Sequence, residues 1–353
     1  MTKTTEEKLR ARIQMLERAL RRAEQAQATQ EEVRQKIFGL AAAPPRVVAL
    51  ATPKPKDGDE GRPGVPVLML SDWHVGETVQ PGSAGGNRYN TMAAFTRAAN
   101  LFENANHVIE LQWRAAGKAG KPTQIVLPLL GDFVSGEIHD ELARTNEIDP
   151  LPSVLAARDI LLTLIKGFAS HYGRVICPCV SGNHGRTDRK PSAKHALWRN
   201  LDWLLYTMLE RDFLGDKRVT FLTPGDNMAF FQVYDVRFLA MHGHDLGVRG
   251  GDGIIGSVGP IMRGRAKMAA FCEARRTPFD TLLLGHWHQH AIMPGVVVNG
   301  SLKGPDEFTL GVLRARPEPA GQALFFVHPR YGITSHWLVR VEDKANTRRA
   351  TKQ

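Results

Sequence analysis

Short apolar runs recur through most of the chain after residue 65, and they constrain the fold more than any other feature. They alternate with longer segments of helical pattern around residues 91–116, 152–171 and 192–213. Runs of this length without polar alternation are typical of strands buried on both faces of an α/β fold. The runs are VPVLMLS, QIVLPLLG, RVICPCVSG, VRFLAMHG, DTLLLGH and GVVVNGS. Near the end of the chain, QALFFVHP and ITSHWLVRV predict a pair of strands that closes a sheet.

Five of these runs end in residues of the types that bind metal ions. In α/β sheets, sites form at the carboxyl ends of strands, which bring distant parts of the sequence to one crevice. The set mixes carboxylate and amide oxygens with imidazoles and has no thiolate, so it suits Mn²⁺, Fe or Zn²⁺ better than a cysteine-bound structural zinc. The residues are Asp72 and His74, Asp132, Asn183 and His184, His242 and His244, and His286 and His288.

The order of these motifs is more specific than any one of them. A single D-x-H or H-x-H pair places both side chains on one face of a strand, but it is usually incidental. Here D-x-H, G-D, G-N-H, H-G-H and G-H-x-H follow one another, each at the end of an apolar run. In this order they resemble the calcineurin-like metallophosphoesterase superfamily, over residues 66 to about 305.

This resemblance implies an α/β fold, namely a four-layer αββα sandwich of two mixed sheets, with two metal ions bridged by an aspartate. By similarity, Asp132 is the bridge and His184 is the catalytic histidine, which polarises the phosphate or protonates the leaving oxygen. The implied ligands of the first ion are Asp72, His74, Asp132 and His288, and those of the second are Asp132, Asn183, His242 and His286.

The implied activity is that of a dinuclear metal-dependent phosphoester hydrolase. Two close cations stabilise the attacking and leaving oxygens of the displacement and activate a hydroxide ion, with His184 assisting. We expect two divalent ions, Mn²⁺ in the first place, with Fe, Zn²⁺ and Ni²⁺ as alternatives. The substrate is expected to be a phosphodiester, specifically nucleic acid, because the net charge is +10. Phosphomonoesterase or nucleotide phosphohydrolase activity, and a non-catalytic interaction scaffold, remain alternatives.

The chain also departs from the family pattern. Gly185 and Arg186 replace the usual acidic residue after G-N-H, and no second aspartate follows G-D at the usual distance. A guanidinium at this position can bind phosphate bidentately, so Arg186 is predicted to bind substrate, and His244 to contact the phosphate. His290 is interpreted as a surface or supporting imidazole. The motif G-N-H-G-R most resembles phage or bacterial members and DNA double-strand-break repair exonucleases.

A glycine-rich run at residues 245–267 lacks the Lys-Ser/Thr of a phosphate-binding loop. Two interpretations stay open for it. It is either a mobile loop whose basic residues follow a nucleic-acid backbone, or a solvated linker. Its basic residues are Arg249, Arg263, Arg265 and Lys267.

Four segments are expected along the chain. Residues 1–41 predict a helical or coiled-coil segment, in which residues 6–40 either mediate oligomerisation or partner docking or lie as an amphipathic helix on their own domain. Residues 42–65 are a Pro/Gly-rich linker, 66–342 the metallophosphoesterase domain and 343–353 a basic tail.

Composition indicates the compartment. No apolar stretch reaches the roughly 18 residues of a membrane span, and the N-terminus lacks the apolar region of a signal peptide. The three cysteines, an odd number, fit buried thiols in a reducing compartment. We therefore expect no membrane association and a cytoplasmic location, in a bacterium or a phage-infected cell.

Overall fold

Two stacked β-sheets, each with parallel and antiparallel pairs, dominate the computed structural model, which describes residues 48–49, 61–116, 120–191, 194, 196–247 and 258–342. Sheet A has the order β1 (Val48–Ala49), β6 (Ala229–Val233), β7 (Val236–Met241), β8 (Thr281–Leu284), β10 (Val296–Val298), β9 (Ala291–Met293). Sheet B has the order β12 (Gly332–Arg340), β11 (Gly321–His328), β2 (Val65–Leu68), β3 (Gln124–Val126), β4 (Arg174–Pro178), β5 (Val219–Leu222).

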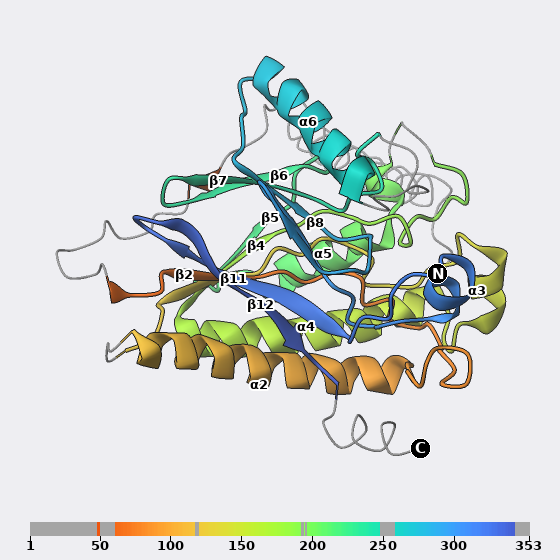
Figure 1. Cartoon of the computed structure of the whole chain (residues 1–353). Coiled ribbons are helices and arrows are strands. Elements are labelled where there is room, and N and C mark those ends of the chain that lie inside the picture. The colour runs from red at the N-terminus through yellow and green to blue at the C-terminus, as the bar shows by residue number, and fades with distance from the viewer. Residues whose placement is uncertain are drawn as a thin grey trace, which may run out of the picture. The chain divides into compact units, whose positions relative to one another are not determined.

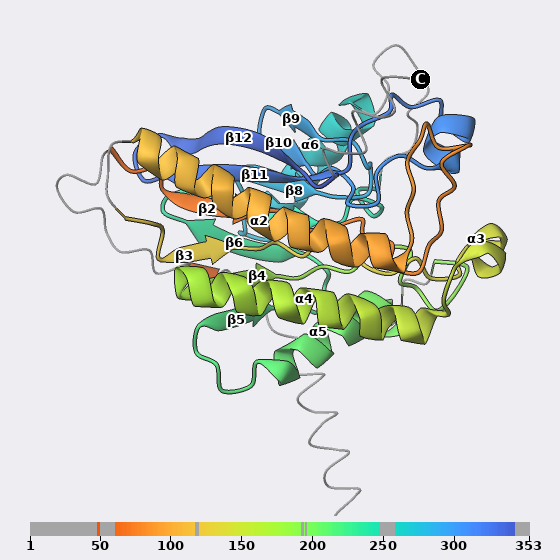
Figure 2. The ribbon, with the colours of Figure 1, turned by 90° about the horizontal axis from the view of Figure 1, so that it is seen from below.

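Helices cover the outer faces of both sheets (Figures 1 and 2). Helix α6 (Val258–Ala274) lies on sheet A, and α2 (Thr91–Ala115), α4 (Pro150–Tyr172) and α5 (Leu201–Asp212) lie on sheet B. The shorter helices are α3 (Asp140–Thr145), the 3-10 helix Leu197–Arg199 and the π-helix Phe308–Val312. No helix among the described residues combines the length and apolar character needed to cross a membrane.

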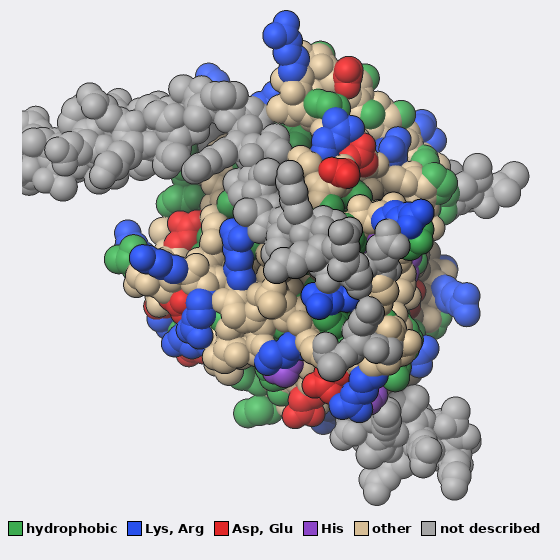
Figure 3. Space-filling model, turned by 90° about the vertical axis from the view of Figure 1, so that its left-hand side faces the viewer, with side chains coloured by type: hydrophobic (Ala, Val, Ile, Leu, Met, Phe, Trp, Pro, Cys, Tyr) green, Lys and Arg blue, Asp and Glu red, His purple; other side chains and the backbone are tan. Residues whose placement is uncertain are grey.

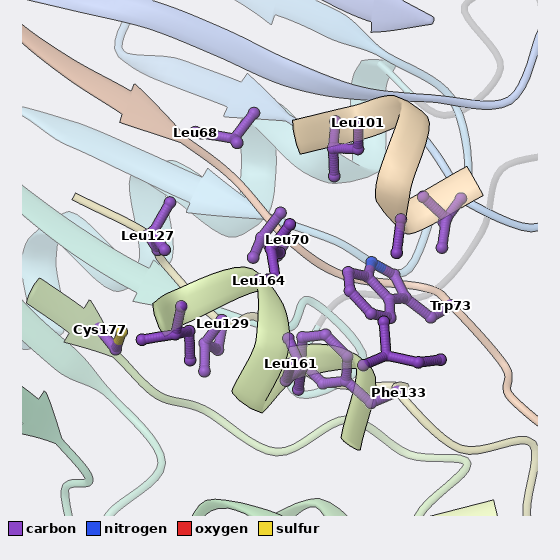
Figure 4. Packing of buried hydrophobic residues seen from close by; sticks show 14 of the residues in the cluster. Leu68, Leu70, Trp73, Leu101, Leu127, Leu129, Phe133, Leu161, Leu164 and Cys177 are labelled. Carbon is purple, nitrogen blue, oxygen red and sulfur yellow. The ribbon is translucent and has the colours of Figure 1, made fainter. Parts of the chain in front are cut away.

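The alternation of side chains along β2 and the residues after it explains why the apolar runs are uninterrupted. Leu68 and Leu70 belong to the apolar cluster that includes residues of α2 and α4, and Figure 4 shows both within this cluster, together with Leu161 and Leu164 of α4. In contrast, the side chains of residues 65, 67 and 69 belong to the cluster between the two sheets. Both faces of the strand are therefore buried, and each large apolar side chain contributes about 1.5–3 kcal/mol of transfer free energy.

The predicted α/β sandwich of two mixed sheets is confirmed, and the topology brings the ends of several strands together. Strands β2, β3, β4 and β5 are parallel in sheet B, and β7, β8 and β10 are parallel in sheet A. The predicted closing strand pair is also present, because β11 and β12 are antiparallel at the edge of sheet B. The predictions for residues 1–41, for most of 42–65 and for 343–353 lie outside the described residues.

Two sequence predictions about helices were wrong. The helix predicted over residues 192–213 begins only at Leu201, because Asn200 has an extended backbone and caps the helix by accepting a hydrogen bond from the Asp202 amide. The glycine-rich run was interpreted as a loop or linker, yet its last part forms α6. Pro260 lies in the first turn of α6, where a missing N–H costs no hydrogen bond. Arg263, Arg265 and Lys267 lie on this helix, and Arg249 lies outside the described residues.

Candidate metal centre

The loops after three strands, β2, β3 and β8, hold five of the seven predicted ligands in an uncommon backbone conformation. A positive φ is rare for residues other than glycine, although Asp, Asn and His tolerate it better than most. Ten non-glycine residues of the described part have a positive φ, and five of these are predicted ligands. They are Asp72 (56°), His74 (50°), Asp132 (55°), His286 (69°) and His288 (55°). Backbone strain concentrated in this way is a signature of functional sites.

The first group of potential ligand atoms comprises Asp72, His74 and His288. The Nε2 atoms of His74 and His288 are 3.1 Å apart, and His288 Nε2 lies 3.3 Å from a carboxylate oxygen of Asp72. Burial, together with the charges of Lys303 and His184, lowers the pKa of His74 well below its usual value. A neutral imidazole is the form that binds a metal ion.

The second group comprises Asp132, His242 and His286. His242 Nε2 lies 3.0 Å from Asp132 Oδ2 and 3.2 Å from the side-chain oxygen of Asn183. The two groups adjoin, because ligand atoms of His74, Asp132 and His184 also lie within 4.8 Å of one another. The structure thus brings all seven predicted ligands together, with Asp132 between the two groups.

Acceptor atoms converge here in a way that requires a positive charge. His242 Nδ1 lies 2.6 Å from the Leu130 carbonyl, to which it donates, so Nε2 is the ring nitrogen that faces the oxygens of Asp132 and Asn183. Asp132 Oδ2 is buried and accepts no hydrogen bond within the described residues. Burial opposes a charged His242, but Asp132 outweighs burial and raises the pKa of His242 to about 10. A divalent cation would supply the same positive charge, so the residues fit a metal ion.

His184 lies beside these groups with its ring orientation fixed. Its Nδ1 donates to the Ser135 carbonyl at 3.0 Å, and its ring stands perpendicular to that of His74 with centroids 4.5 Å apart. Its backbone amide donates to Asp132 Oδ1 at 2.7 Å. The Ser135 carbonyl thus fixes the tautomer of His184, which leaves Nε2 to interact with a substrate.

Residues 299–301, interpreted from sequence as structural, hold Asp72 in place through hydrogen bonds. Asn299 donates to the Ser71 hydroxyl at 2.9 Å, and that hydroxyl donates to Asp72 Oδ2 at 2.5 Å. Ser301 Oγ donates to the Asp72 carbonyl at 2.9 Å. Only glycine fits at residue 285, because a Cβ there would lie 2.8 Å from the Asp72 carboxylate.

Glu77 and Lys303 form a buried support for His74 that sequence reasoning missed. Glu77 Oε2 lies 3.5 Å from His74 Nδ1, and neither atom has another partner within the described residues. Lys303 Nζ binds the other oxygen of Glu77 at 2.8 Å and also contacts Asp306. A carboxylate behind a ligand histidine orients the ring and fixes its tautomer. The sequence signal was weak: a glutamate three residues after His74 in D-W-H-V-G-E.

Asp202 is a second buried carboxylate that sequence reasoning missed. It accepts backbone hydrogen bonds from Asp132 (2.9 Å), Phe133 (3.1 Å) and Gly182 (2.9 Å). Burial and the charge of Asp132 raise the pKa of Asp202 to about 6. Asp202 thus holds the loops that carry G-D and G-N-H, the two motifs at which the sequence departs from the family pattern. The cue was an N-x-D pattern at the start of an apolar helical run.

The remaining predicted residues lie around the centre. Arg186 is half-buried, and its Nε is a buried donor with no acceptor within the described residues. His244 is exposed, with its ring centroid 5.4 Å from that of His242. His290 does not join either ligand group of the described residues, because its Nδ1 is 3.0 Å from the Val298 carbonyl.

The arrangement is a candidate two-metal centre with oxygen and nitrogen ligands and no thiolate, since all three cysteines are buried elsewhere in free form. The chain matches no protein family and no curated protein. Among solved structures, it is similar to a Staphylococcus aureus protein described as a candidate 5'-nucleotidase, solved with alpha-ketoglutarate. The alignment has 15% identity and a TM-score of 0.32, and it covers 82% of this chain and 57% of that protein. Similarity at this level does not establish an activity.

Proposed function

We propose that this chain is a dinuclear metal-dependent phosphoester hydrolase of the calcineurin-like metallophosphoesterase type. The observation that carries the proposal is a pair of adjacent ligand groups from the ends of four strands of two sheets, which a third group of His74, Asp132 and His184 connects. Two divalent cations held by these residues would stabilise negative charge on the attacking and leaving oxygens of a phosphoester. The first ion would bind Asp72, His74, Asp132 and His288, and the second Asp132, Asn183, His242 and His286.

The protein's own residues would orient the phosphoester and handle its protons. The Nδ1 of His184 is held by the Ser135 carbonyl, so Nε2 can donate to or accept from a phosphate or leaving oxygen. Arg186 has a buried Nε without an acceptor in the described part of the chain, which a phosphate oxygen would supply. His244, exposed beside His242, would contact the same phosphate from the solvent side.

The proposed substrate class is a phosphodiester, with nucleic acid first, and the proposed metal is Mn²⁺. Support for nucleic acid comes from the net charge of +10 and from Arg186. On the face in Figure 3, Lys and Arg side chains are scattered among acidic and hydrophobic ones and form no continuous patch.

The test uses metal-stripped full-length chain to which Mn²⁺ is restored. Hydrolysis of methyl p-nitrophenyl phosphate, p-nitrophenyl phosphate and labelled single- and double-stranded DNA is measured beside the number of bound ions. We expect two ions per chain and faster hydrolysis of the diesters. Replacing His184 with Ala should lower kcat by about 10²–10⁴-fold while both ions stay bound. Arg199→Ala is a matched control, because Arg199 is exposed and pairs with Asp188.

Three outcomes would each contradict a part of the proposed function. Full activity in His184→Ala would contradict the role of His184. Two bound ions without hydrolysis of any of these substrates would favour the interaction scaffold. Failure to bind any divalent ion would reject the metal centre itself.

A further inference from the structure

A cavity of about 390 Å³ lies next to the candidate metal centre and contains none of its predicted ligands. Its wall is formed by α6, by the segment that follows His286, by the loop before β11 and by the end of β12. The volume is within the range of small-molecule sites. The polar and aromatic side chains of the lining include Trp287, Gln289, Arg316, Glu318 and Arg340.

Trp287 connects the cavity to the centre. It stands in sequence between His286 and His288, which belong to different ligand groups. Its ring lies against that of His286, with centroids 4.8 Å apart and planes inclined at 66°. A molecule in the cavity therefore contacts the same indole that flanks the metal ligands.

The cavity is lined by more positive than negative charge. Arg316 and Arg340 are exposed, and no carboxylate of the described residues pairs with either guanidinium. The single acidic lining residue, Glu318, already accepts a hydrogen bond from the His290 amide at 2.5 Å. Two unpaired guanidinium groups beside an indole favour an anion that carries a flat ring.

We propose that this cavity binds a nucleoside phosphate unit of the substrate, next to the phosphoester held at the metal centre. This rests on the proposed function and narrows its substrate class to nucleotides. The indole face of Trp287 offers a stacking surface for a base, and Gln289 offers an amide to its edge. Arg316 and Arg340 bind the neighbouring phosphate that is not cleaved, because guanidinium groups match phosphate oxygens bidentately.

The experiment compares two diesters in Mn²⁺-loaded full chain. One is a 5'-phosphorylated thymidine dinucleotide, which fills the cavity, and the other is methyl p-nitrophenyl phosphate, which is too small to reach it. We expect Arg316→Gln and Arg340→Gln each to raise KM for the dinucleotide about 10-fold, since a charged hydrogen bond is lost, and to leave KM for the small diester unchanged. Arg314→Gln is the matched control, because Arg314 is exposed on the same loop and does not line the cavity.

Calorimetric titration of the metal-stripped chain with thymidine 3',5'-bisphosphate, ribose 5-phosphate and inorganic phosphate gives a second readout that needs no activity. We expect the bisphosphate to bind most tightly and both cavity variants to weaken it. Equal effects in Arg314→Gln, or equal effects on both diesters, would overturn the proposal. If neither diester is hydrolysed, the proposed function fails, and the calorimetric comparison still decides whether the cavity binds nucleotides.

Discussion

Asp132 lies between the two ligand groups of the candidate centre, and hydrogen bonds hold its backbone and one of its side-chain oxygens. Its amide donates to Asp202, its carbonyl accepts from the amides of Trp73 (2.9 Å) and His74 (3.0 Å), and one side-chain oxygen accepts from the His184 amide. Burial raises the pKa of Asp132, but His242 and His184 outweigh burial and hold it well below its usual value. These contacts hold a left-handed backbone that costs about 1–2 kcal/mol, and they leave Oδ2 directed at the ligands.

Replacing Glu77 with Gln should weaken metal binding more than it weakens the fold. The amide still contacts Lys303, but it no longer presents a negative oxygen to His74 Nδ1, so the ring is held less firmly. Loss of such a partner typically costs 10–100-fold in metal affinity. Calorimetric titration of stripped protein with Mn²⁺ measures this affinity.

Glu103→Gln is the control for this change, because Glu103 is exposed on α2 and belongs to none of the ligand groups of the described residues. Mn²⁺ affinities that agree between the two variants would remove Glu77 from the support of the centre.

Single residues also show why the sequence revealed the ligands and not their supports. The ligands stand directly after apolar runs, so strand topology alone predicts that they meet. Glu77 and Lys303 are 226 positions apart, and Asp132 and Asp202 are 70 positions apart, in segments without a shared motif. Only the folded chain shows that these buried charges have partners.

At the scale of elements, the start of α5 is the support for two ligand loops. Asp202 receives three backbone hydrogen bonds from the loops after β3 and β4, and Asn200 donates to the Gly182 carbonyl at 2.8 Å. Asn200 also caps α5, so the helix begins at the point where Asn200 and Asp202 hold the two loops.

Asp202→Ala should therefore destabilise the protein strongly. Each buried N–H left without an acceptor costs about 1–3 kcal/mol, so we expect a loss of about 3 kcal/mol or more in the free energy of unfolding. Asp202→Asn, which keeps one acceptor oxygen, should lose less. Urea unfolding monitored by circular dichroism measures both, and an alanine variant as stable as the parent chain would refute the role of Asp202.

Helices and strands could be predicted from sequence where apolar residues form a clear pattern. They could not be predicted where glycine and proline interrupt that pattern. The strands buried on both faces and the helices α2 and α4 follow directly from apolar pattern and spacing. Helix α6 could not be predicted from apolar pattern and spacing, because Gly259, Pro260 and Gly264 are residue types typical of loops. Tertiary packing explains it: Gly264 lies against Leu246, where a Cβ would come within 3.0 Å of the leucine side chain.

The loop between β10 and the π-helix contains a carboxylate whose charge stabilises the fold in a defined pH range. Burial opposes ionisation of Asp306, but Lys303 and the Thr309 amide outweigh burial and lower its pKa below the usual value of 3.8. The groups that face this carboxylate are Lys303, Thr309 and, electrostatically, His288, and Lys303 also binds Glu77.

A lowered folded-state pKa means that this contribution is present above about pH 4 and is lost as the pH falls further. Asp306→Asn should therefore reduce the free energy of unfolding most near pH 6, and the difference from the parent chain should shrink toward pH 3. Urea unfolding in EDTA across this range tests the prediction, with exposed Asp235→Asn as control. A difference that stays constant with pH would contradict it.

At the scale of the whole molecule, the candidate centre joins the ends of the two sheets. Asp72 and Asp132 follow strands of sheet B, whereas His242, His286 and His288 follow strands of sheet A. The close pairs cross from one sheet to the other: His288 to Asp72 at 3.3 Å and His242 to Asp132 at 3.0 Å. Ions bound between these pairs would therefore resist separation of the sheets as well as serve catalysis.

An ion that binds only the folded state stabilises that state by RT ln(1 + [L]/Kd). This is about 2.7 kcal/mol when the free ion concentration is 100 times the Kd. We expect the Tm of EDTA-treated protein to rise by several degrees on titration with Mn²⁺ and to depend on ion concentration. Asp132→Asn, which preserves the shape of the side chain but not its charge, should lose most of this rise, because both ions of the proposed centre would share that carboxylate. The exposed control Asp235→Asn should keep it. A Tm indifferent to Mn²⁺, or an equal rise in Asp132→Asn, would mean that the ions do not bridge the two sheets through Asp132.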